Sequence, residues 1–273
     1  MLTQRESFLY SYNINKEFRF AIVGGSMCDP SPRKFALLVT GVLNPQFTSR
    51  YGTVTQIFER FLKEAGEVWD TFLVANGDFS FMDGIDDYSG FVVTGSQFDA
   101  HANDPWILQL CQTLKCLHHM KKKILGICFG HQVLARALGG STGRAPIGWD
   151  LGLSTVNLET MRIYELFGLD LTSQVKVIEI HQDQVKRLPP DALILGSSHK
   201  TRVEMFSIGD HVLGIQSHPE LTKAFVRDRT SDLLVRNEIS AEFAKETIQS
   251  IEQGELDQVV MKKLCKTFLK GHS

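Results

Sequence analysis

The chain has 273 residues, of which 43% are hydrophobic, and its 29 Lys and Arg against 31 Asp and Glu give a formal net charge of -2. A chain of this length and apolar content can bury a core of its own, which excludes a mainly disordered protein. The sequence lacks the basic excess of a nucleic-acid binder and any run of about 18 apolar residues long enough to span a membrane. We therefore expect neither nucleic acid nor a membrane as a partner.

The five cysteines are scattered and show no CxxC spacing. An odd, dispersed set of cysteines is neither a disulfide framework nor a zinc signature. Charged residues also interrupt the first 34 residues, so they contain no apolar run of the signal-peptide type. We expect a protein of the cytosol, with an organelle as the alternative. For four of the thiols we expect a buried, unreactive position: Cys28, Cys111, Cys116 and Cys265.

Strand and helix patterns alternate along the first half of the chain. Apolar runs predict strands at residues 35–39, 68–74, 90–94 and 123–127. Apolar residues at helical spacing predict helices over 53–65, ended by Gly66, and from Trp106 to Leu117. This alternation predicts an α/β fold with an open, mostly parallel, doubly wound sheet, whose sites lie at the carboxyl ends of the strands.

The second half of the chain is predicted to contain shorter strands and a helical tail. The strands are expected at residues 154–158, 175–180, 193–195, 203–208 and 212–215, and the helices at 161–167, 242–253 and 256–269. No repeat or linker divides the sequence, so we expect a single domain over residues 34–273. Residues 1–33 are predicted to form a separate N-terminal extension with little order.

A candidate nucleophile lies where a predicted strand gives way to a helix, in the segment Gly126-Ile127-Cys128-Phe129-Gly130. Glycines two residues before and two after Cys128 permit a sharp, strained strand-to-helix turn, as in GxSxG elbows. The N-terminus of the following helix favours a thiolate over a thiol and offers free N–H groups to a developing oxyanion. A lone GxCxG is only suggestive, because small residues also pack where a strand meets a helix.

A candidate base follows the predicted strand at residues 212–215, in the segment His218-Pro219-Glu220. Residues two apart in extended backbone project to the same side, so Glu220 can accept a hydrogen bond from one ring nitrogen of His218. The other ring nitrogen then faces the thiol. Pro219 stiffens the link between the two side chains.

These two segments together resemble the class I glutamine amidotransferase domain, a Cys-His-Glu hydrolase on an open α/β sheet. The matching pattern is Gly126-x-Cys128-x-Gly130-x-Gln132 followed by Gly214-x-Gln216-x-His218-Pro219-Glu220. Within that superfamily the sequence most resembles the plant γ-glutamyl peptidases, from about residue 34 to residue 271. The resemblance implies a γ-glutamyl peptidase acting on small γ-glutamyl peptides such as glutathione conjugates.

The resemblance also implies a role for individual residues. Cys128 would attack the γ-carbonyl and form a thioester, His218 would transfer protons, and Glu220 would orient His218. The backbone N–H groups of Gly95 and Phe129 would hold the oxyanion. Substrate-binding positions would be Ser96, Gln132, His181 and Gln182. No cofactor and no metal are implied, and we reject His181 as a metal ligand or as an alternative base because no further ligands have a compatible spacing.

The family pattern does not assign a role to two charged residues, and one loop differs from it. Arg144 and Asp150 are each as suited to an ordinary surface position as to the substrate, so neither belongs to the predicted site. The loop Gly95-Ser96-Gln97-Phe98-Asp99 is less rich in glycine and proline than in many amidotransferases, which leaves its pocket contacts open.

Two other functions remain as alternatives to the peptidase. The sequence has no GxxxxGK[ST] loop, so it encodes no acceptor chemistry of its own, and a glutaminase would supply ammonia to a separate synthetase chain. A non-catalytic binding protein on the same fold is the third possibility. For the peptidase, the resemblance implies a role in sulfur-containing specialised metabolism of the glucosinolate type.

Overall fold

The computed structural model describes residues 32–271. The predicted extension over residues 1–33 therefore lies, apart from its last two residues, outside the described residues, as does Cys28. The extension and its boundary stay predictions.

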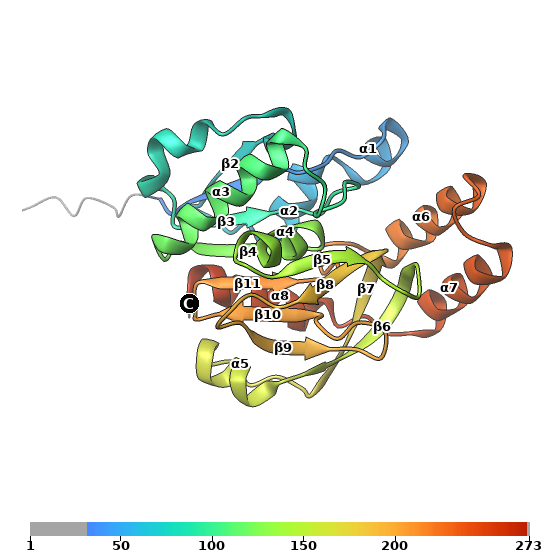
Figure 1. Cartoon of the computed structure of the whole chain (residues 1–273). Coiled ribbons are helices and arrows are strands. Elements are labelled where there is room, and N and C mark those ends of the chain that lie inside the picture. The colour runs from blue at the N-terminus through green and yellow to red at the C-terminus, as the bar shows by residue number, and fades with distance from the viewer. Residues whose placement is uncertain (1–31, 272–273) are drawn as a thin grey trace, which may run out of the picture. The chain divides into compact units, whose positions relative to one another are not determined.

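A nine-stranded sheet forms the centre of the domain (Figure 1). Its spatial order is β2-β1-β3-β4-β11-β10-β9-β6-β7. The strands are β1 Lys34–Leu38, β2 Val68–Phe72, β3 Gly90–Val93, β4 Lys123–Ile127, β6 Asp150–Leu158, β7 Gln174–His181, β9 Leu193–Ser197, β10 Met205–Ile208 and β11 Val212–Ile215. Two short strands, β5 Ser141–Arg144 and β8 Asp183–Arg187, form a separate antiparallel pair.

The first five strands in this order are parallel to one another, from β2 to β11. Only β10 and β6 run in the opposite direction, because each pairs antiparallel with both of its neighbours. The predicted open, mostly parallel α/β sheet is thus confirmed. Since β3, β4 and β11 are adjacent and parallel, their carboxyl ends lie at the same edge of the sheet.

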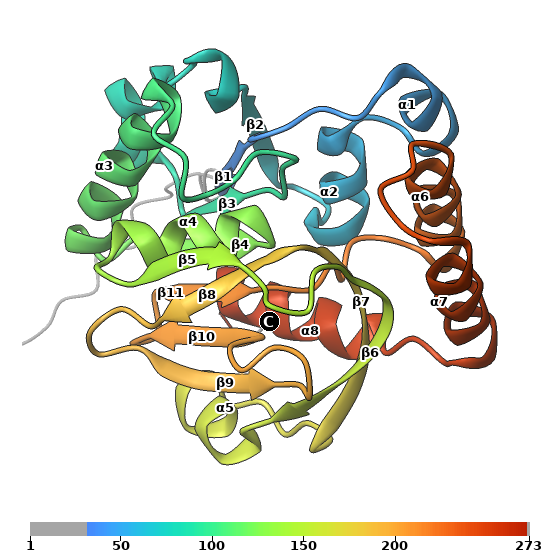
Figure 2. The same ribbon diagram turned by 45° about the vertical axis from the view of Figure 1, so that its right-hand side comes forward.

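Helices cover both faces of the sheet (Figures 1 and 2). The helices are α1 Pro45–Tyr51, α2 Val54–Leu62, α3 Pro105–His119, α4 Phe129–Ala137, α5 Thr160–Phe167, α6 Lys223–Val235, α7 Ala241–Gln253 and α8 Gln258–Lys270, with 3-10 turns η1 Val74–Asn76 and η2 Ser80–Asp87. Helices α2, α5 and α8 pack on one face and α3 and α4 on the other. Successive side chains of β4 point to opposite faces of the sheet. Ile124 packs in the apolar cluster with α3 and α4, and Leu125 packs in the cluster with α2, α5 and α8.

A third apolar cluster joins α1, α6 and α7 to β6 and β7. Phe47 of α1 packs edge-on against Phe225 of α6, with ring centroids 5.1 Å apart. The side-chain oxygen of Thr222 accepts from the N–H of Phe225 and caps α6. This cluster places α1 and α6 beside the carboxyl edge of the parallel strands (Figure 2).

Several element boundaries differ from the sequence-based prediction. Helix α2 ends at Leu62, because Lys63 is already extended, so Gly66 lies in a later turn and does not end the helix. Strand β6 begins at Asp150, four residues before the predicted start, across Gly152 with its φ of 110°. The sequence analysis missed α1, α6, β5 and β8, which are short or rich in polar residues and therefore show weak apolar periodicity.

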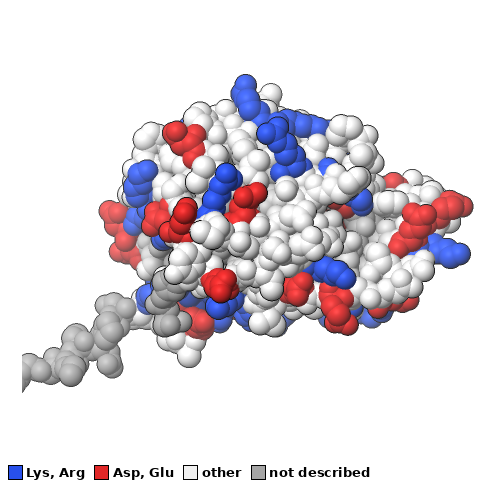
Figure 3. Space-filling view, turned by 90° about the horizontal axis from the view of Figure 1, so that it is seen from below, with Lys and Arg blue, Asp and Glu red and all other residues white. Residues whose placement is uncertain are grey.

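The exposed surface carries charges of both signs. In Figure 3, Lys and Arg side chains are interspersed with Asp and Glu over the visible face. Within residues 32–271, no helix combines the length and apolar character required to cross a bilayer.

We predict that Gly126→Ala destabilises the fold. A Cβ at position 126 lies 2.5 Å from the backbone carbon and oxygen of Gly130, so α4 has to move away from β4. We expect the free energy of unfolding, measured by urea denaturation, to fall by about 1–3 kcal/mol. In the control Gly143→Ala, the nearest atom is 3.9 Å away. Equal stability of the two variants would contradict this account of the packing.

Candidate active site

Cys128 lies in the turn between β4 and α4. Its φ of 52° falls in the left-handed region, which is strained for a residue other than glycine. The turn is held on both sides, because the N–H of Cys128 donates to the carbonyl of Ile215 at 2.8 Å and its carbonyl accepts from the N–H of Gln132 at 3.0 Å. A Cβ at position 130 would lie 2.3 Å from the carbonyl oxygen of Val93, so only glycine permits this approach of α4 to β3.

His218 and Glu220 follow the end of β11. The Nδ1 of His218 is 2.8 Å from the Oε1 of Glu220, and both residues are buried. The backbone N–H of His218 donates to the carbonyl of Ile178 at 2.8 Å, which fastens this segment to β7. Since a carboxylate only accepts, Nδ1 carries the proton and Nε2 is left for a second partner.

Gly95, Cys128 and His218 converge at the edge where β3, β4 and β11 end. A Cβ at position 95 would lie 2.9 Å from the Cε1 of His218 and 3.6 Å from the Cβ of Cys128. Burial by itself lowers the pKa of His218, but the opposite charges of Cys128 and Glu220 outweigh it and raise this pKa well above the usual value. The arrangement favours the protonated, positively charged form of His218 beside Cys128.

Two backbone N–H groups beside the sulfur are free to bind an anion. Within residues 32–271, neither the N–H of Gly95 nor that of Phe129, the first residue of α4, donates a hydrogen bond. The Gly95 loop is held by Thr40, whose hydroxyl donates to the carbonyl of Gly95 at 3.1 Å. Ser96 contributes to the same support, since its hydroxyl donates to the carbonyl of Thr40 at 2.6 Å.

The predicted substrate-binding residues Gln132, His181 and Gln182 line one cavity together with Cys128. Two of them are held in place by Asp183, because the Nε2 of Gln132 and the Nδ1 of His181 bond to its carbonyl at 2.8 and 2.9 Å. The carbonyl of Gln182 accepts from the N–H of Ala145 at 2.7 Å. Gln132 also donates to Gln216, so its amide protons are used within the protein.

The cavity has a volume of about 630 Å³. Apolar side chains from α1, α2 and α6 form one wall, and Arg144 stands on the other, within 3.0 Å of Asp183 and 3.3 Å of Asp99. Arg144 is half exposed and lines the cavity, whereas Asp150 does not. The surface position considered for Asp150 is wrong, because pairing of β6 with β7 buries it to 2% exposure, where it accepts from Lys200 at 3.0 Å.

Two groups in the described part of the chain have the residue types of a metal site: Asp99, His101 and Asp183, and Glu179, His181 and Glu204. In the first group the guanidinium of Arg144 already pairs with one oxygen of each carboxylate. The second group is buried, and only its His181 lines the cavity. The expectation of an unreactive, buried position holds for Cys111 and Cys265 but is wrong for Cys116, which is exposed on α3.

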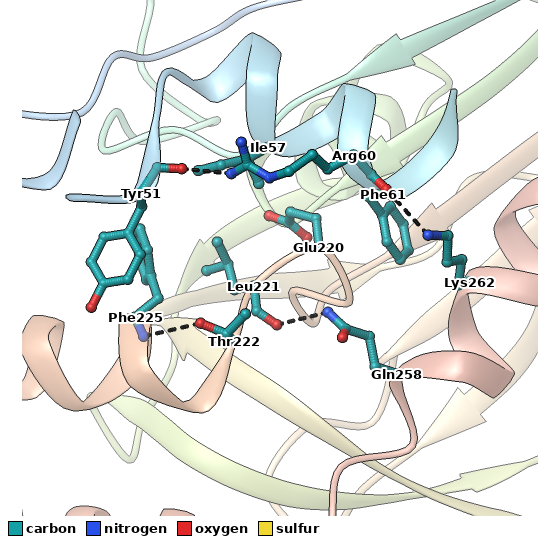
Figure 4. A pocket seen from close by; sticks show the side chains of 10 residues that line it. All are labelled: Tyr51, Ile57, Arg60, Phe61, Glu220, Leu221, Thr222, Phe225, Gln258 and Lys262. Carbon is teal, nitrogen blue, oxygen red and sulfur yellow. Dashed lines mark hydrogen bonds between the residues drawn. The ribbon is translucent and has the colours of Figure 1, made fainter. Parts of the chain in front are cut away.

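A second, smaller cavity of about 220 Å³ lies between α2, α8 and the start of α6 (Figure 4). Glu220 reaches its wall, and Gln258 at the start of α8 forms its other side. The Nε2 of Gln258 donates to the carbonyls of Pro219 and Leu221, both at 3.0 Å, on either side of Glu220. The sequence analysis missed Gln258, because nothing in a helical segment 38 residues from Glu220 signals this contact.

Comparison with known proteins decides the family. Residues 85–228 match the family described as glutamine amidotransferase class-I. The chain belongs to this family. Among class I relatives, gamma-glutamyl peptidase 3 of Arabidopsis thaliana is 40% identical over 244 residues, covering 88% of this chain and 97% of that protein. Gamma-glutamyl peptidase 4 of the same plant is 38% identical over 241 residues, covering 87% and 96%.

Solved structures agree with the class I assignment. A glutamine amidotransferase from Thermotoga maritima has a TM-score of 0.66 at 21% identity, covering 88% of this chain and 97% of that one. A putative GMP synthase subunit from Thermoplasma acidophilum has a TM-score of 0.56 at 23% identity, covering 76% and 98%. These likenesses show the fold. The resemblance inferred from the sequence motifs is confirmed. The chain is a hydrolase, because it is 40% identical to named peptidases over nearly their full length.

We predict that His218→Ala slows alkylation of Cys128 by iodoacetamide at about pH 6 by at least about tenfold, because the imidazolium no longer stabilises the thiolate. Mass spectrometry of the separated peptides follows each cysteine. Exposed Cys116 serves as the internal control, and its rate should not change. Equal rates for Cys128 in both proteins would contradict the ion pair.

We predict that Gln258→Ala loosens the segment that carries Glu220. Two carbonyls lose their donor, so the free energy of unfolding should fall by about 1–2 kcal/mol. Alkylation of Cys128 should slow to a rate between those of the wild type and His218→Ala. Gln253→Ala, at an exposed position on α7, is the matched control and should leave both quantities unchanged. An unchanged alkylation rate in Gln258→Ala would remove the link from Gln258 to the Cys-His pair.

Proposed function

We propose that this hydrolase cleaves the γ-glutamyl bond of small γ-glutamyl peptides, with Cys128 as nucleophile, His218 as acid and base and Glu220 as the group that orients His218. The observation that carries the proposal is the convergence of these three side chains at the wall of one cavity. The His218 pKa is raised there by Cys128 and Glu220. Two free backbone N–H groups lie beside the sulfur.

The first half of the reaction forms a thioester. The thiolate of Cys128 attacks the γ-carbonyl carbon, and the negative oxygen that develops is bound by the N–H groups of Gly95 and Phe129. His218, protonated before the attack, gives its Nε2 proton to the departing amine as the C–N bond breaks. Glutamate remains attached through its γ-carbonyl to the sulfur, and the shortened peptide leaves.

The second half restores the enzyme. Neutral His218 accepts a proton from a water molecule, whose oxygen attacks the thioester carbonyl. The C–S bond breaks, glutamate is released, and the Cys128 thiolate and His218 imidazolium are formed again. Glu220 keeps the imidazole ring oriented in both halves through its 2.8 Å hydrogen bond to Nδ1.

The cavity suits a substrate with a charged head and a larger leaving group. Gln132, His181 and Gln182 lie on the side where we place the glutamyl head, close to Arg144 and Asp183. The apolar wall, which includes Phe58, faces the space left for the leaving peptide. Glutathione conjugates, with an apolar group on the cysteine, fit this division.

We extend the proposal to the cytosol and to sulfur-containing specialised metabolism of the glucosinolate type. The four cysteines of the described part are unpaired, which suits a reducing compartment. The metabolic role is supported only by the resemblance to plant γ-glutamyl peptidases, four of which match this chain over nearly their full length.

A glutaminase that feeds a separate synthetase is the second candidate. The class I match supports it, as does a putative glutamine amidotransferase of Saccharomyces cerevisiae that is 36% identical over 139 residues, 50% of this chain and 54% of that protein. The two candidates share the thioester step and differ in the leaving group, which is an amino acid or peptide in one and ammonia in the other.

The deciding experiment uses wild type, Cys128→Ala and, as a matched control, Cys116→Ala. Each is incubated with a glutathione S-conjugate and separately with glutamine, and mass spectrometry measures glutamate, the cysteinylglycine conjugate and ammonia. We expect wild type and Cys116→Ala to release glutamate and the cysteinylglycine conjugate, and Cys128→Ala to be at least about 1000-fold slower. Efficient release of ammonia from glutamine with the conjugate intact would favour the glutaminase. Inactivity on both substrates would favour a binding protein.

A further inference from the structure

Three buried titratable side chains lie next to the active-site cavity, which one of them, His181, also lines. Glu179 and His181 occupy core-facing positions of β7, in alternation after Val175 and Val177. Glu204 directly precedes β10. Their exposed fractions are 0% for Glu179, 4% for His181 and 1% for Glu204. Acidic residues are almost never buried to this extent without a partner.

The three side chains face one another. One carboxyl oxygen of each glutamate and one ring nitrogen of His181 all lie within 4.8 Å of one another. The Nε2 of His181 lies 3.2 Å from the Oε2 of Glu179. Within residues 32–271, neither the carboxyl oxygens of the two glutamates nor the Nε2 of His181 has a hydrogen-bond partner.

Among residues 32–271, no cation near the two glutamates is free to neutralise both carboxylates. The ammonium of Lys200 is bonded to Asp150 on β6, which itself adds negative charge. Burial lowers the pKa of His131 on α4 to about 3, so this ring is neutral. The charge of His218 is matched by Glu220 and Cys128. The pair must therefore hold at least one proton.

Burial raises the pKa of both carboxyl groups. The pKa of Glu179 lies well above its usual value, and Asp150 raises it further. Burial and the charge of Glu179 raise the pKa of Glu204 to about 9. Both directions agree with the geometry, because two acids packed together in a low dielectric cannot both ionise.

His181 connects the protonated glutamates to the active site. Its Nδ1 must carry a proton, because its partner at 2.9 Å is the carbonyl oxygen of Asp183, which only accepts. Its Nε2 faces the Oε2 of Glu179 at 3.2 Å, so the proton held by the Glu179 carboxyl group decides whether the ring meets a neutral or a charged neighbour. The carbonyl of Asp183 also accepts from Gln132, and residues 181–183 line the substrate cavity.

We propose that Glu204, Glu179 and His181 form a proton-holding relay that positions the backbone of residues 181–183 for the glutamyl head of the substrate. The relay runs from the carboxyl group of Glu204 to Glu179, to the ring of His181 and to the carbonyl of Asp183. Its loss weakens substrate binding more than turnover. This inference rests on the proposed γ-glutamyl activity, but its protonation state can be tested without substrate.

The relay also makes stability depend on pH. Glu204 ionises near 4.5 in the unfolded chain and near 9 in the folded one, so the folded state binds more protons between these values. Its contribution to the free energy of unfolding therefore falls as the pH rises through this range. Glutamine at position 204 keeps a donor and cannot ionise, so it lacks this dependence.

The experiment compares wild type, Glu204→Ala, Glu204→Gln and the exposed control Glu165→Gln. We expect Glu204→Ala to raise KM by about tenfold or more with kcat changed by less than about threefold, and Glu204→Gln to restore KM near pH 7. Melting temperatures are measured at about pH 5 and pH 9. Relative to wild type, Glu204→Gln should gain stability at the higher pH, and Glu165→Gln should not.

Each of the other possible results would contradict a specific part of the proposal. A divalent metal that copurifies with the wild type at one per chain and is lost in Glu204→Gln would replace the relay by a metal site. A KM in Glu204→Gln as high as in Glu204→Ala, or an unchanged KM in both, would remove the positioning role. If the wild type cleaves no γ-glutamyl substrate, the proposed function fails, and the melting temperatures still show whether Glu204 holds a proton. If Glu204→Ala does not fold, Glu204→Gln alone is used to test both the positioning role and the protonation state. Its KM and its melting temperature at alkaline pH are then compared with those of the wild type.

Discussion

The strained turn at Cys128 is the constraint on which the rest of the site depends. A cysteine with a φ of 52° is tolerated only because β4 and α4 are fastened on both sides of it. The same closeness excludes side chains at Gly126 and Gly130. Because α4 begins at the next residue, a free N–H and the positive end of the helix lie beside the sulfur. The same turn therefore strains the backbone of Cys128, begins helix α4 and stabilises a thiolate.

Strand order turns this local feature into a site. The neighbours of β4 are β3 and β11, and the three parallel strands deliver Gly95, Cys128 and His218 to the same edge. Strand β7 is distant in the sheet order, yet the bond from His218 to Ile178 joins it to this edge. The cavity forms in the space that this junction and the third apolar cluster enclose. A substrate bound there meets residues from both halves of the chain.

Burial acts differently on each titratable group around the site. His131 has no charged partner and its pKa falls to about 3, whereas His218 lies between two opposite charges and its pKa rises. The pKa of Glu204 rises because burial disfavours its charged form and the neighbouring Glu179 is also an acid. One low-dielectric layer therefore contains a neutral imidazole, an imidazolium and a protonated carboxyl group, and the neighbours of each group decide its charge.

The sequence by itself determined the features that depend on near neighbours: the alternation of strands and helices, the elbow around Cys128 and the His218-Pro219-Glu220 segment. These are local because backbone geometry and side-chain spacing act over a few residues. Helix α6, the burial of Asp150, the contact of Gln258 with the Glu220 segment and the meeting of Glu179 with Glu204 were decided only by the tertiary structure. Each depends on which distant strands and helices lie side by side, and that arrangement follows from burying apolar surface across the whole chain, which no local spacing encodes.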